Sequence, residues 1–328
     1  MKGARAVVSS DVTFSGHLSV VVPTRDTSDL TVQCLAAVTQ AAIGMWCEVI
    51  LVDDGSRDGT ADRVRVLFPD VRIMRHDESR GFTASANAGL REATGTVLLL
   101  LNSDTEVRAG SLHAVMDAFD RDAALGVAGA QLLNSDGTPQ WSGGRRPDCW
   151  WLFAEASGIA RGLACVPGYR RLRPLKRAGD RDVAWVSGAA LAMRRTVWES
   201  IGPLDESFHL YGQDLDFCVR AGRAPWRIRI LAGATVLHHQ GATITRMTGT
   251  VNRHAISTLW TDLVSWSAKE GGTGDARRAA LAIALGARLR LLGRWLMTPS
   301  VARARRQPWF DQSREISAAL HALRGLPR

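Results

Sequence analysis

The stretch TVLLLLNSDTEV, residues 96–107, carries a continuous apolar run directly into a cluster of oxygen-bearing side chains. Consecutive leucines without polar alternation are typical of a strand buried on both faces, as in a parallel sheet covered by helices. Asn102, Ser103 and Asp104 follow at once. Because ligands of open α/β sheets bind outside the carboxyl ends of the strands, the stretch predicts an α/β fold with a polar site at this edge.

The segments around this stretch alternate between strand and helix patterns. We expect strands at 18–24, 47–56, 71–77 and 96–104, and helices at 28–41, 58–68, 83–94 and 109–122. This order predicts a mostly parallel sheet with helices on both faces. Ser28 or Asp29 is suited to cap the first helix, and Asp58 or Ser56 the second. Residues 131–185, rich in Gly, Arg, Trp and Pro, predict a long irregular segment, and regular structure resumes from 184 to 243.

The composition is that of a globular protein. The chain has 328 residues, 46% of them hydrophobic, which is enough for one large domain with additions or for two smaller ones. Its five cysteines contain no C-x-x-C pair and predict free thiols in a reducing cytosol. The first residues lack the apolar region of a signal peptide, and no apolar run approaches the roughly 20 residues of a membrane span. We therefore expect a cytoplasmic protein.

The positive charge is concentrated at the C-terminal end. Residues 271–328 contain eleven Arg, no Lys and three acidic residues, a net charge of +8, whereas residues 1–270 carry 30 basic and 29 acidic residues. This distribution argues against nucleic-acid binding along the protein and favours a local basic surface. The sequence also places five leucines on one helical stripe, with Arg290 and Arg294 opposite: Leu281, Leu285, Leu289, Leu292 and Leu296. Such a helix either lies on an anionic membrane through residues 277–306 or packs its leucines on the catalytic domain and exposes its arginines to solvent.

Two strand ends carry acidic residues that suit a nucleotide and a metal. In VDDGS, residues 52–56, a carboxylate of Asp53 or Asp54 can accept a hydrogen bond from a base imide or a ribose hydroxyl. In NSD, residues 102–104, Asp104 suits a hard cation such as Mg²⁺ or Mn²⁺ that bridges to a diphosphate. The alternative for the second motif is a simple turn in which the side chain bonds its own backbone.

Two later motifs add a candidate base and a candidate metal partner. In GQDLDFCVRAG, residues 212–222, Asp214 precedes a helix, and we expect it to be an ionised general base with a low pKa, because a helix N-terminus favours the carboxylate. Asp216 lies four residues before Arg220, and we expect a structural pair. In LHHQG, residues 237–241, His238 follows a strand and is a candidate metal or phosphate partner.

Several common nucleotide-binding and catalytic motifs are missing from the sequence. No G-x-G-x-x-G follows the first strand, and there is neither a Walker A lysine motif nor a G-x-S-x-G elbow. A dinucleotide-binding enzyme, a P-loop enzyme and an α/β-hydrolase therefore lack support.

Six pieces of the chain, in this order, resemble family 2 glycosyltransferases, the inverting class with the GT-A fold, and most of all their rhamnosyltransferase-like members. The pieces are SVVVPT, VILVDDGSRDGT, RGFTASANAGLREATG, LLLLNSDTEV, VSGAALAMRRTVWESIGPLDESFHLYGQDLDFCVRAG and VLHHQGAT. The resemblance extends from Leu18 to Thr243.

The resemblance implies a role for each matching residue. Asp214 would be the catalytic base, and Asp104 with His238 would hold Mg²⁺ or Mn²⁺. The residues expected to bind the donor are Pro23, Thr24, Arg25, Asp53, Asp54, Arg80, Asn87, Asn102 and Ser103. Three positions depart from the common pattern: Asn102 replaces the first Asp of the D-x-D motif, Gln213 replaces a Glu, and Arg80 replaces a Leu.

The expected function is transfer of a sugar from dTDP-rhamnose or a UDP-sugar to a hydroxyl of a glycan or lipid-linked acceptor, as in cell-surface polysaccharide assembly. The enzyme would be cytoplasmic or peripheral at the inner face of the plasma membrane. We expect an N-terminal extension at 1–17, a catalytic domain at 18–250 with a nucleotide-sugar half at 18–125 and an acceptor half at 126–250, and a basic helical region at 251–328. The alternatives are a sugar-1-phosphate nucleotidyltransferase and a non-catalytic sugar-binding protein.

Overall fold

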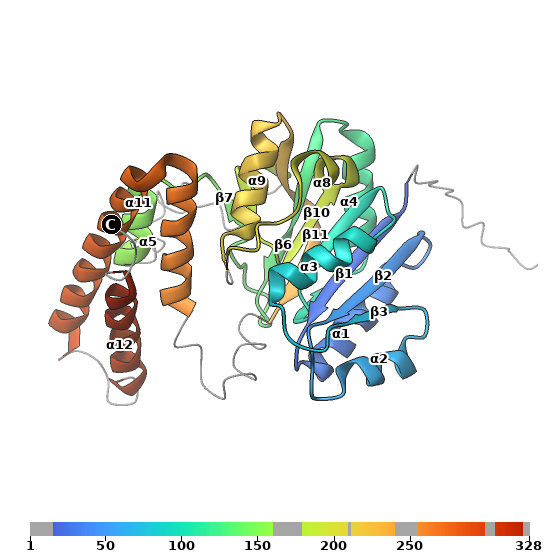
Figure 1. Ribbon diagram of the computed structural model, residues 1–328, viewed down its shortest axis with the longest axis horizontal. Coiled ribbons are helices and arrows are strands. Elements are labelled where there is room, and N and C mark those ends of the chain that lie inside the picture. Colours follow the sequence, from blue (N-terminus) through green and yellow to red (C-terminus); the bar gives the residue numbers. More distant parts are fainter. Residues whose placement is uncertain (1–15, 160–178, 209–210, 240–254, 299–305, 324–328) are drawn as a thin grey trace, which may run out of the picture.

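A computed structural model describes residues 16–159, 179–208, 211–239, 255–298 and 306–323 of the chain. A nine-stranded sheet forms its centre, and helices cover both faces (Figure 1). The strands are β1 (Leu18–Thr24), β2 (Cys47–Asp53), β3 (Arg72–Arg75), β4 (Val97–Leu101), β5 (Thr105–Val107), β6 (Leu125–Leu133), β7 (Gly143–Gly144), β8 (Arg181–Asp182), β9 (Trp185–Val186), β10 (Ala190–Arg194) and β11 (Arg227–His238). The helices are α1 (Ser28–Ala41), α2 (Thr60–Leu67), α3 (Phe82–Glu92), α4 (Ser111–Arg121), α5 (Cys149–Ser157), α8 (Arg195–Ile201), α9 (Gln213–Arg223), α11 (Ala255–Met297) and α12 (Arg306–Ala322).

The sheet is parallel where the sequence predicts it and mixed beyond that point. The strand order is β3-β2-β1-β4-β10-β6-β11-β5, with β8 paired to β11. The first four strands of this order are mutually parallel. Strand β10 then enters antiparallel to both β4 and β6, while β11 runs parallel to β6. The antiparallel strand β10 thus joins the parallel half of the sheet to the half formed later in the chain.

The leucines of β4 are buried on both faces of the sheet, as predicted. Leu98 and Leu100 belong to the core beneath α3, α8 and α9. Leu99 and Leu101 belong to the opposite core, beneath α1 and α4. Because all of these side chains are removed from water, the strand needs no polar alternation.

Three expectations on local structure need correction. The segment 131–185 is not wholly irregular, because β6 extends to Leu133 and α5 lies within it. Neither Ser28 nor Asp29 caps α1, whose N-cap residue is Thr27 without a side-chain hydrogen bond. Instead the Asp58 carboxylate accepts hydrogen bonds from the amides of Ser28 (2.9 Å) and Thr60 (3.1 Å). One carboxylate therefore holds the first turns of two helices. The prediction that Asp58 or Ser56 caps the second helix is wrong, because the N-cap residue of α2 is Gly59, without a side-chain hydrogen bond.

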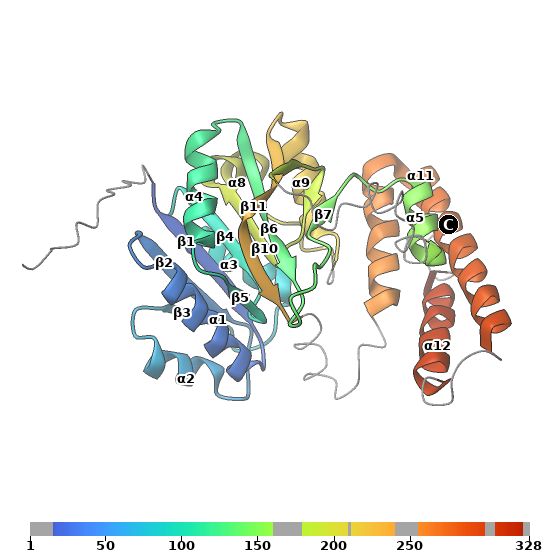
Figure 2. The ribbon, with the colours of Figure 1, turned by 180° about the vertical axis from the view of Figure 1, so that it is seen from behind.

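The helices α5, α11 and α12 pack together beside the sheet (Figure 2). Residues near the start of α11, among them Trp260 and Leu263, share the core that contains Phe217 of α9. Lys269 of α11 adds an ion pair to the buried Asp216 of α9 (2.6 Å). The helix is interrupted at its two adjacent glycines, which have non-helical backbone angles, before it continues to Met297. Among the described helices, none is long and apolar enough to cross a membrane.

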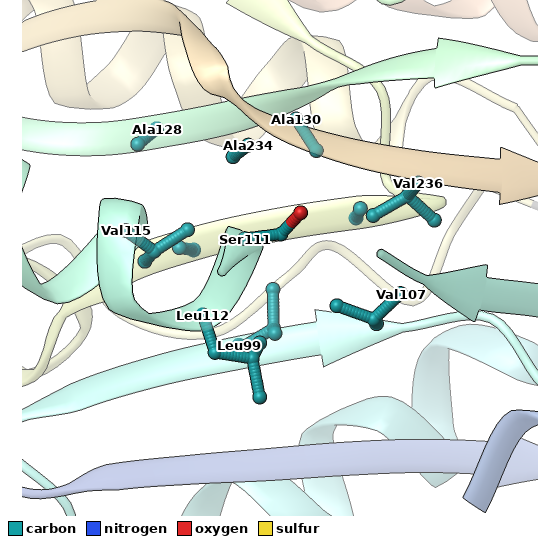
Figure 3. Close-up of a pocket in the computed structure, with 11 residues that line it drawn as sticks. Leu99, Val107, Ser111, Leu112, Val115, Ala128, Ala130, Ala234 and Val236 are labelled. Carbon is teal, nitrogen blue, oxygen red and sulfur yellow. The ribbon is translucent and has the colours of Figure 1, made fainter. Parts of the chain in front are cut away.

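A small apolar cavity lies between α4 and the sheet (Figure 3). Small side chains, among them Ala128, Ala130 and Ala234, line it on the sheet side. The polar side chain in its lining is Ser111, whose hydroxyl already makes hydrogen bonds within the protein. It donates to the Thr235 carbonyl and accepts from the Thr235 amide, both at 3.0 Å. The cavity is therefore a packing gap in the core and offers no polar group to a ligand.

Candidate active site

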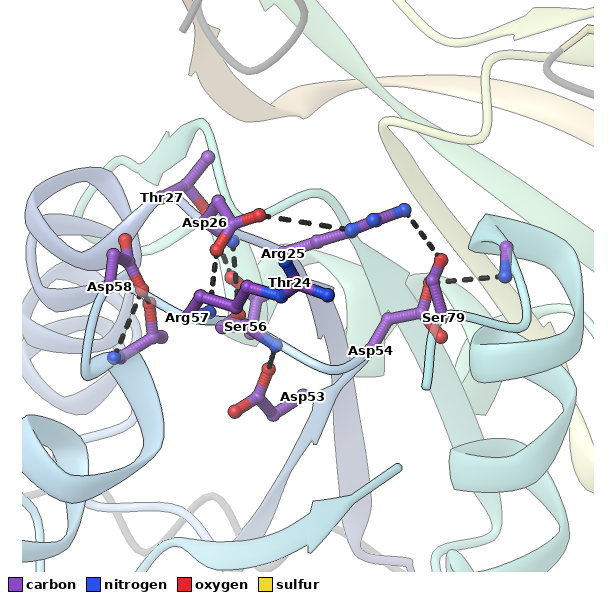
Figure 4. Close-up of polar contacts among 12 residues, drawn as sticks. Thr24, Arg25, Asp26, Thr27, Asp53, Asp54, Ser56, Arg57, Asp58 and Ser79 are labelled. Carbon is purple, nitrogen blue, oxygen red and sulfur yellow. Dashed lines mark hydrogen bonds and ion pairs between the residues drawn. The ribbon is translucent and has the colours of Figure 1, made fainter. Parts of the chain in front are cut away.

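The segments after β1, β2 and β3 make polar contacts at the carboxyl edge of the parallel strands (Figure 4), and the segment after β4 joins them through Ser103. The Thr24 carbonyl accepts a hydrogen bond from the Asp54 amide at 2.9 Å. Thr24 and Thr27 are bonded through their hydroxyls (2.9 Å), and Thr27 lies 3.2 Å from the Ser103 hydroxyl. The predicted residues Thr24 and Ser103 thus lie in one buried network of hydroxyls, and Pro23 is buried next to it in β1.

Asp53 has one carboxylate oxygen that is free of hydrogen bonds. Its Oδ1 accepts from the Ser56 amide at 2.8 Å. Its Oδ2 is buried without a hydrogen-bond partner, and Arg75 Nε lies 3.6 Å away. A buried acceptor of this kind is costly unless a ligand supplies a donor, so Asp53 is suited to bind an imide or hydroxyl hydrogen.

Asp54 uses both carboxylate oxygens within the protein. It accepts hydrogen bonds from the Ser79 hydroxyl (2.6 Å), the amides of Arg80 (2.7 Å) and Gly81 (3.0 Å), and the Ser85 hydroxyl (2.9 Å). Burial by itself would raise the pKa of Asp54, but these hydrogen bonds hold it below its ordinary value. Asp54 therefore shapes the segment between β3 and α3, and both of its carboxylate oxygens are engaged within the protein.

The two predicted arginines differ in their surroundings. Arg25 extends between Asp26 and Ser79, with Nη1 donating to the Ser79 hydroxyl at 2.6 Å (Figure 4). The side chain of Arg80 is exposed and makes no hydrogen bond or ion pair within the described part of the chain. Arg80 is thus the cation that is available for a phosphate, whereas Arg25 joins two segments of the site.

Asn87 has a structural environment. Its amide nitrogen donates to the Leu204 carbonyl (2.9 Å) and to Glu206 (2.7 Å), and its oxygen accepts from the Leu204 amide (3.1 Å). The side chain is fully buried. All of its hydrogen-bonding groups are engaged, so Asn87 fixes the segment before α9 and has no group left for a donor substrate.

Asp104 and His238 lie side by side, as expected, at the end of β11. His238 Nε2 is 3.5 Å from Asp104 Oδ1. Gln140 determines the state of the histidine ring: its amide nitrogen donates to the His238 carbonyl (2.5 Å), so its oxygen faces His238 Nδ1 (2.9 Å). In a neutral imidazole Nδ1 then carries the hydrogen, and the lone pair of Nε2 points toward the carboxylate.

A divalent cation fits this arrangement. A carboxylate oxygen and a nitrogen lone pair that face each other are both acceptors, and a cation between them relieves their repulsion. Asn102 Oδ1 is buried without a hydrogen bond and adds an amide oxygen to the set. Oxygen and imidazole ligands suit Mn²⁺, and Mg²⁺ also accepts one or two carboxylates together with phosphate oxygens. Within the described ranges no group of three or more His, Cys, Asp or Glu side chains is placed to hold a metal ion.

Asp214 is held at the N-terminus of α9 by two backbone amides. Its Oδ2 accepts from Gly188 (2.9 Å) and its Oδ1 from Leu215 (2.8 Å). The predicted position at the helix start is confirmed, but the predicted low pKa is wrong. Burial raises the pKa of Asp214 above its ordinary value, because loss of hydration disfavours the charged form more than the amide hydrogen bonds favour it.

Asp216 points away from this site and forms a buried ion pair. It accepts from Arg220 Nε at 2.8 Å, so the predicted pair is confirmed, and Lys269 lies 2.6 Å from its other oxygen. Asp216 is 1% exposed, whereas the side chains of Arg220 and Lys269 are 22% and 40% exposed, so a buried carboxylate pairs with two cations that reach the surface.

One turn connects the candidate base to the candidate metal ligands. Gly188 donates its amide to Asp214, and the next carbonyl, that of Ala189, accepts from the Asn102 amide at 3.1 Å. Both contacts exist because β10 pairs with β4, so the turn before β10 lies beside the end of β4. The candidate base Asp214 and the candidate metal ligand Asn102 are thus both bonded to one turn, through its adjacent residues Gly188 and Ala189.

Three residues of this site were missed in the sequence. Gln140 lies in the segment that we predicted to be irregular, Arg75 in a short strand, and Gly188 in a turn. Their roles depend on pairings over long separations in sequence, such as Gln140 with His238, and no local pattern encodes those pairings.

A model of the family described as glycosyl transferase family 2 matches residues 19–197. The chain is 30% identical over 216 residues to the N-acetylglucosaminyl-diphospho-decaprenol L-rhamnosyltransferase of Mycobacterium tuberculosis, covering 58% of this chain and 66% of the relative. It is 25% identical over 230 residues to the pre-mycofactocin glycosyltransferase of the same organism, covering 67% of this chain and 42% of that relative. The chain thus spans less than two thirds of either relative.

Solved structures show the same fold. The mannosyltransferase PcManGT from Pyrobaculum calidifontis, solved with GDP-Man and Mn²⁺, matches with a TM-score of 0.57 and 17% identity, covering 97% of this chain and 88% of that one. GalNAc-T7, solved with UDP, GalNAc and Mn²⁺, matches with a TM-score of 0.50 and 15% identity over 68% of this chain and 44% of that one. These likenesses confirm the predicted GT-A fold.

Proposed function

The chain belongs to glycosyl transferase family 2, and from this premise we propose that it transfers a sugar from a nucleotide-diphosphate donor to a hydroxyl group, with inversion at the anomeric carbon. The observation that carries the proposal is the position of Asp214, whose carboxylate is held by the Gly188 amide on the turn that also binds Asn102. The acceptor would be a glycan or a lipid-linked sugar, since one relative is named for transfer to N-acetylglucosaminyl-diphospho-decaprenol.

Asp214 acts as the general base in this proposal. It removes the proton of the acceptor hydroxyl while that oxygen attacks the anomeric carbon from the side opposite the leaving group. The bond between the anomeric carbon and the diphosphate oxygen breaks as the new glycosidic bond forms, and the nucleoside diphosphate leaves. The raised pKa makes the Asp214 carboxylate a stronger base than a free carboxylate, which favours proton removal.

Asp53 and Arg80 contact the donor in this proposal. The free Oδ2 of Asp53 accepts a hydrogen bond from the nucleoside, and the exposed guanidinium of Arg80 pairs with a phosphate. Thr24, Ser103 and Asp54 hold the surrounding segments in place. The donor itself would be dTDP-rhamnose or a UDP-sugar, and the rhamnosyltransferase relative favours the first.

Asp104, His238 and Asn102 would hold Mg²⁺ or Mn²⁺, which when bound supplies positive charge to the diphosphate of the donor. Support comes from the facing acceptors Asp104 Oδ1 and His238 Nε2, 3.5 Å apart, and from the unbonded oxygen of Asn102. Gln140 keeps the His238 ring in the orientation that this role requires.

A lipid-linked acceptor would lie in a membrane, so the proposal places the enzyme as a peripheral protein at the inner face of the plasma membrane. The proposed division of the chain is a catalytic domain at 18–250, with donor and acceptor halves at 18–125 and 126–250, followed by a basic helical region at 251–328. An extension at 1–17 lies almost wholly outside the described residues.

Incubation with a panel of nucleotide sugars, Mn²⁺ and a polyprenyl-diphosphate-linked N-acetylglucosamine tests the proposal. We expect release of a nucleoside diphosphate and a glycosylated acceptor whose new linkage has the inverted configuration by NMR. Release of pyrophosphate would instead identify a nucleotidyltransferase, and sugar-nucleotide binding without turnover would identify a binding protein.

A further inference from the structure

In the second half of α11, large apolar side chains face outward and small ones face the protein, which is the reverse of an ordinary surface helix. Such a helix buries its large apolar residues and exposes polar ones. Here five leucines are 43–62% exposed: Leu281, Leu285, Leu289, Leu292 and Leu296. The apolar residues that this second half of α11 buries are few and mostly small, namely Ala279, Ile283, Gly286 and Ala287. The leucines therefore do not pack on the catalytic domain, and that alternative for the C-terminal helix is wrong.

The buried side of α11 is matched to α5. A side-chain carbon on Gly286 would lie 2.4 Å from the Phe153 carbonyl and 2.9 Å from the Ser157 amide, so the two helices touch through their backbones. Arg294, which is 9% exposed, covers the ring of Trp309 in α12 at 3.8 Å. Since these contacts fix the rotation of α11 about its axis, the leucines are held on the outer side.

The outer leucines form a continuous stripe. At 3.6 residues per turn they fall within an arc of about 80°, and the stripe from Leu281 to Leu296 is about 22 Å long. Trp295, 71% exposed, lies at one border of the arc. Arg277 and Arg288 lie at the same border, are exposed, and form no ion pair with any described residue.

We propose that this leucine stripe, residues 281–296, rests on an anionic membrane surface, with its leucines among the acyl chains and Arg277 and Arg288 at the headgroups. A helix with an apolar stripe, a tryptophan border and unpaired arginines has the chemistry of an interfacial helix. Residues 271–328 carry a net charge of +8, which anionic lipid attracts. A second copy of the chain is disfavoured as the occupant, because two such surfaces would bring their arginines together. The inference does not depend on which sugar is transferred, and only its link to a lipid-linked acceptor rests on the proposed function.

Co-sedimentation of the full chain with vesicles tests this surface. We expect binding to phosphatidylglycerol–phosphatidylcholine vesicles at low salt and at least about tenfold weaker binding to pure phosphatidylcholine. The double variant Leu285→Ser/Leu292→Ser should lose at least about tenfold in affinity for the anionic vesicles, because two leucines no longer enter the lipid. The matched control Val66→Ser/Leu67→Ser, on α2, removes side chains that are 80% and 50% exposed elsewhere and should bind like wild type. Arg277→Gln/Arg288→Gln should weaken binding to the anionic vesicles only.

Two further measurements separate the possible outcomes. Hydrogen–deuterium exchange of the wild-type chain should show slower exchange in 281–296 when vesicles are added, which does not require a variant to fold. Sedimentation velocity without lipid should give the same molecular mass for wild type and the double leucine variant. Equal binding of wild type and Leu285→Ser/Leu292→Ser to the anionic vesicles would overturn the proposal. A wild-type chain that is dimeric, with a leucine double variant that is monomeric, would overturn it as well. Neither readout involves sugar transfer, so failure of the proposed function would leave both results interpretable.

Discussion

Exchange of Asp214 and Asp216 for asparagine should separate catalysis from stability within one turn of α9. Asp214→Asn keeps the size of the side chain and retains one oxygen that can accept from Gly188. A general base typically contributes about 10²–10⁴-fold to a rate, so turnover should fall by that factor. Donor binding should stay within about twofold of wild type, because Asp214 contacts the acceptor and not the nucleotide.

The effect of Asp216→Asn on stability can be worked out from its partners. Removal of one member of a buried ion pair costs about 3–5 kcal/mol when the other charge is left alone. Here Arg220 still donates to the carbonyls of Ile201 (2.6 Å) and Pro203 (2.7 Å), and Lys269 still pairs with Asp205 (2.6 Å). Because both cations keep partners, we expect a smaller loss of about 2 kcal/mol, which lowers Tm by roughly 3 °C for a chain of this length.

Two quantities are measured on both variants: kcat with the correct acceptor, and Tm by scanning calorimetry. Asp214→Asn should lose turnover with a small change in Tm, and Asp216→Asn should lose Tm while its folded fraction turns over normally. Near-wild-type kcat in Asp214→Asn would refute the assignment and direct attention to Asp205 or Glu206. An unchanged Tm in Asp216→Asn would refute the reasoning on the buried pair.

Further variants test the remaining assignments. In the pH profile of kcat/KM, the midpoint of the decrease on the acid side should lie above the ordinary Asp pKa of about 3.9. Burial raises the pKa of Asp214, and protonation removes the base. Gln140→Leu should weaken Mn²⁺ binding, followed by paramagnetic resonance without a sugar donor, by about 10–100-fold, and Gln140→Glu, which keeps an acceptor for His238 Nδ1, should weaken it less. Asp54 has a lowered pKa, so its contribution to stability is present above about pH 3.9 and is lost as pH falls through its folded-state pKa; Asp54→Asn should be less stable at pH 7, and its deficit in denaturant unfolding should shrink on acidification. Gly286→Leu should destabilise the packing of α5 on α11 by about 1–3 kcal/mol, seen as a lower Tm.

The parallel half of the fold could be predicted because its rules are local. The strands β1, β2 and β4 are short apolar runs, each bounded by turn residues, and helical patterns separate them along the chain. These local patterns are enough to indicate the order of the elements. The strands β6 and β10 obey no such rule. Strand β6 contains glycines and alanines that match its close neighbours, since a side-chain carbon on Gly129 would lie 2.6 Å from Val186. A segment of small residues that fits close neighbours in this way has the composition of a loop, so the sequence alone does not identify it as a strand.

The site residues divide in the same way, into those that a local pattern identifies and those whose role depends on distant contacts. Asp53, Asp104 and Asp214 were visible because acidic residues at the end of a strand or the start of a helix are conspicuous. The functional difference between Asp53 and Asp54 was not visible, because it depends on the donors that approach from Ser79 to Ser85. The pKa of Asp214 was predicted with the wrong sign for a related reason: the helix N-terminus is evident in the sequence, but the burial that outweighs it is not.

The antiparallel strand β10 brings the proposed base Asp214 to the sheet edge where we propose that the donor binds. In a purely parallel sheet, the strand beside β4 would present its own carboxyl end at this edge. Because β10 runs the other way, its amino end lies there, and the turn before it offers the Gly188 amide to Asp214 and the Ala189 carbonyl to Asn102. A shift of one residue in the β10–β4 register would move these contacts away from the base and the metal ligands together. The pairing Ala190–Leu101 therefore sets the spacing between the proposed base and the proposed metal ligands, and the leucines of β4, buried on both faces, keep that register fixed.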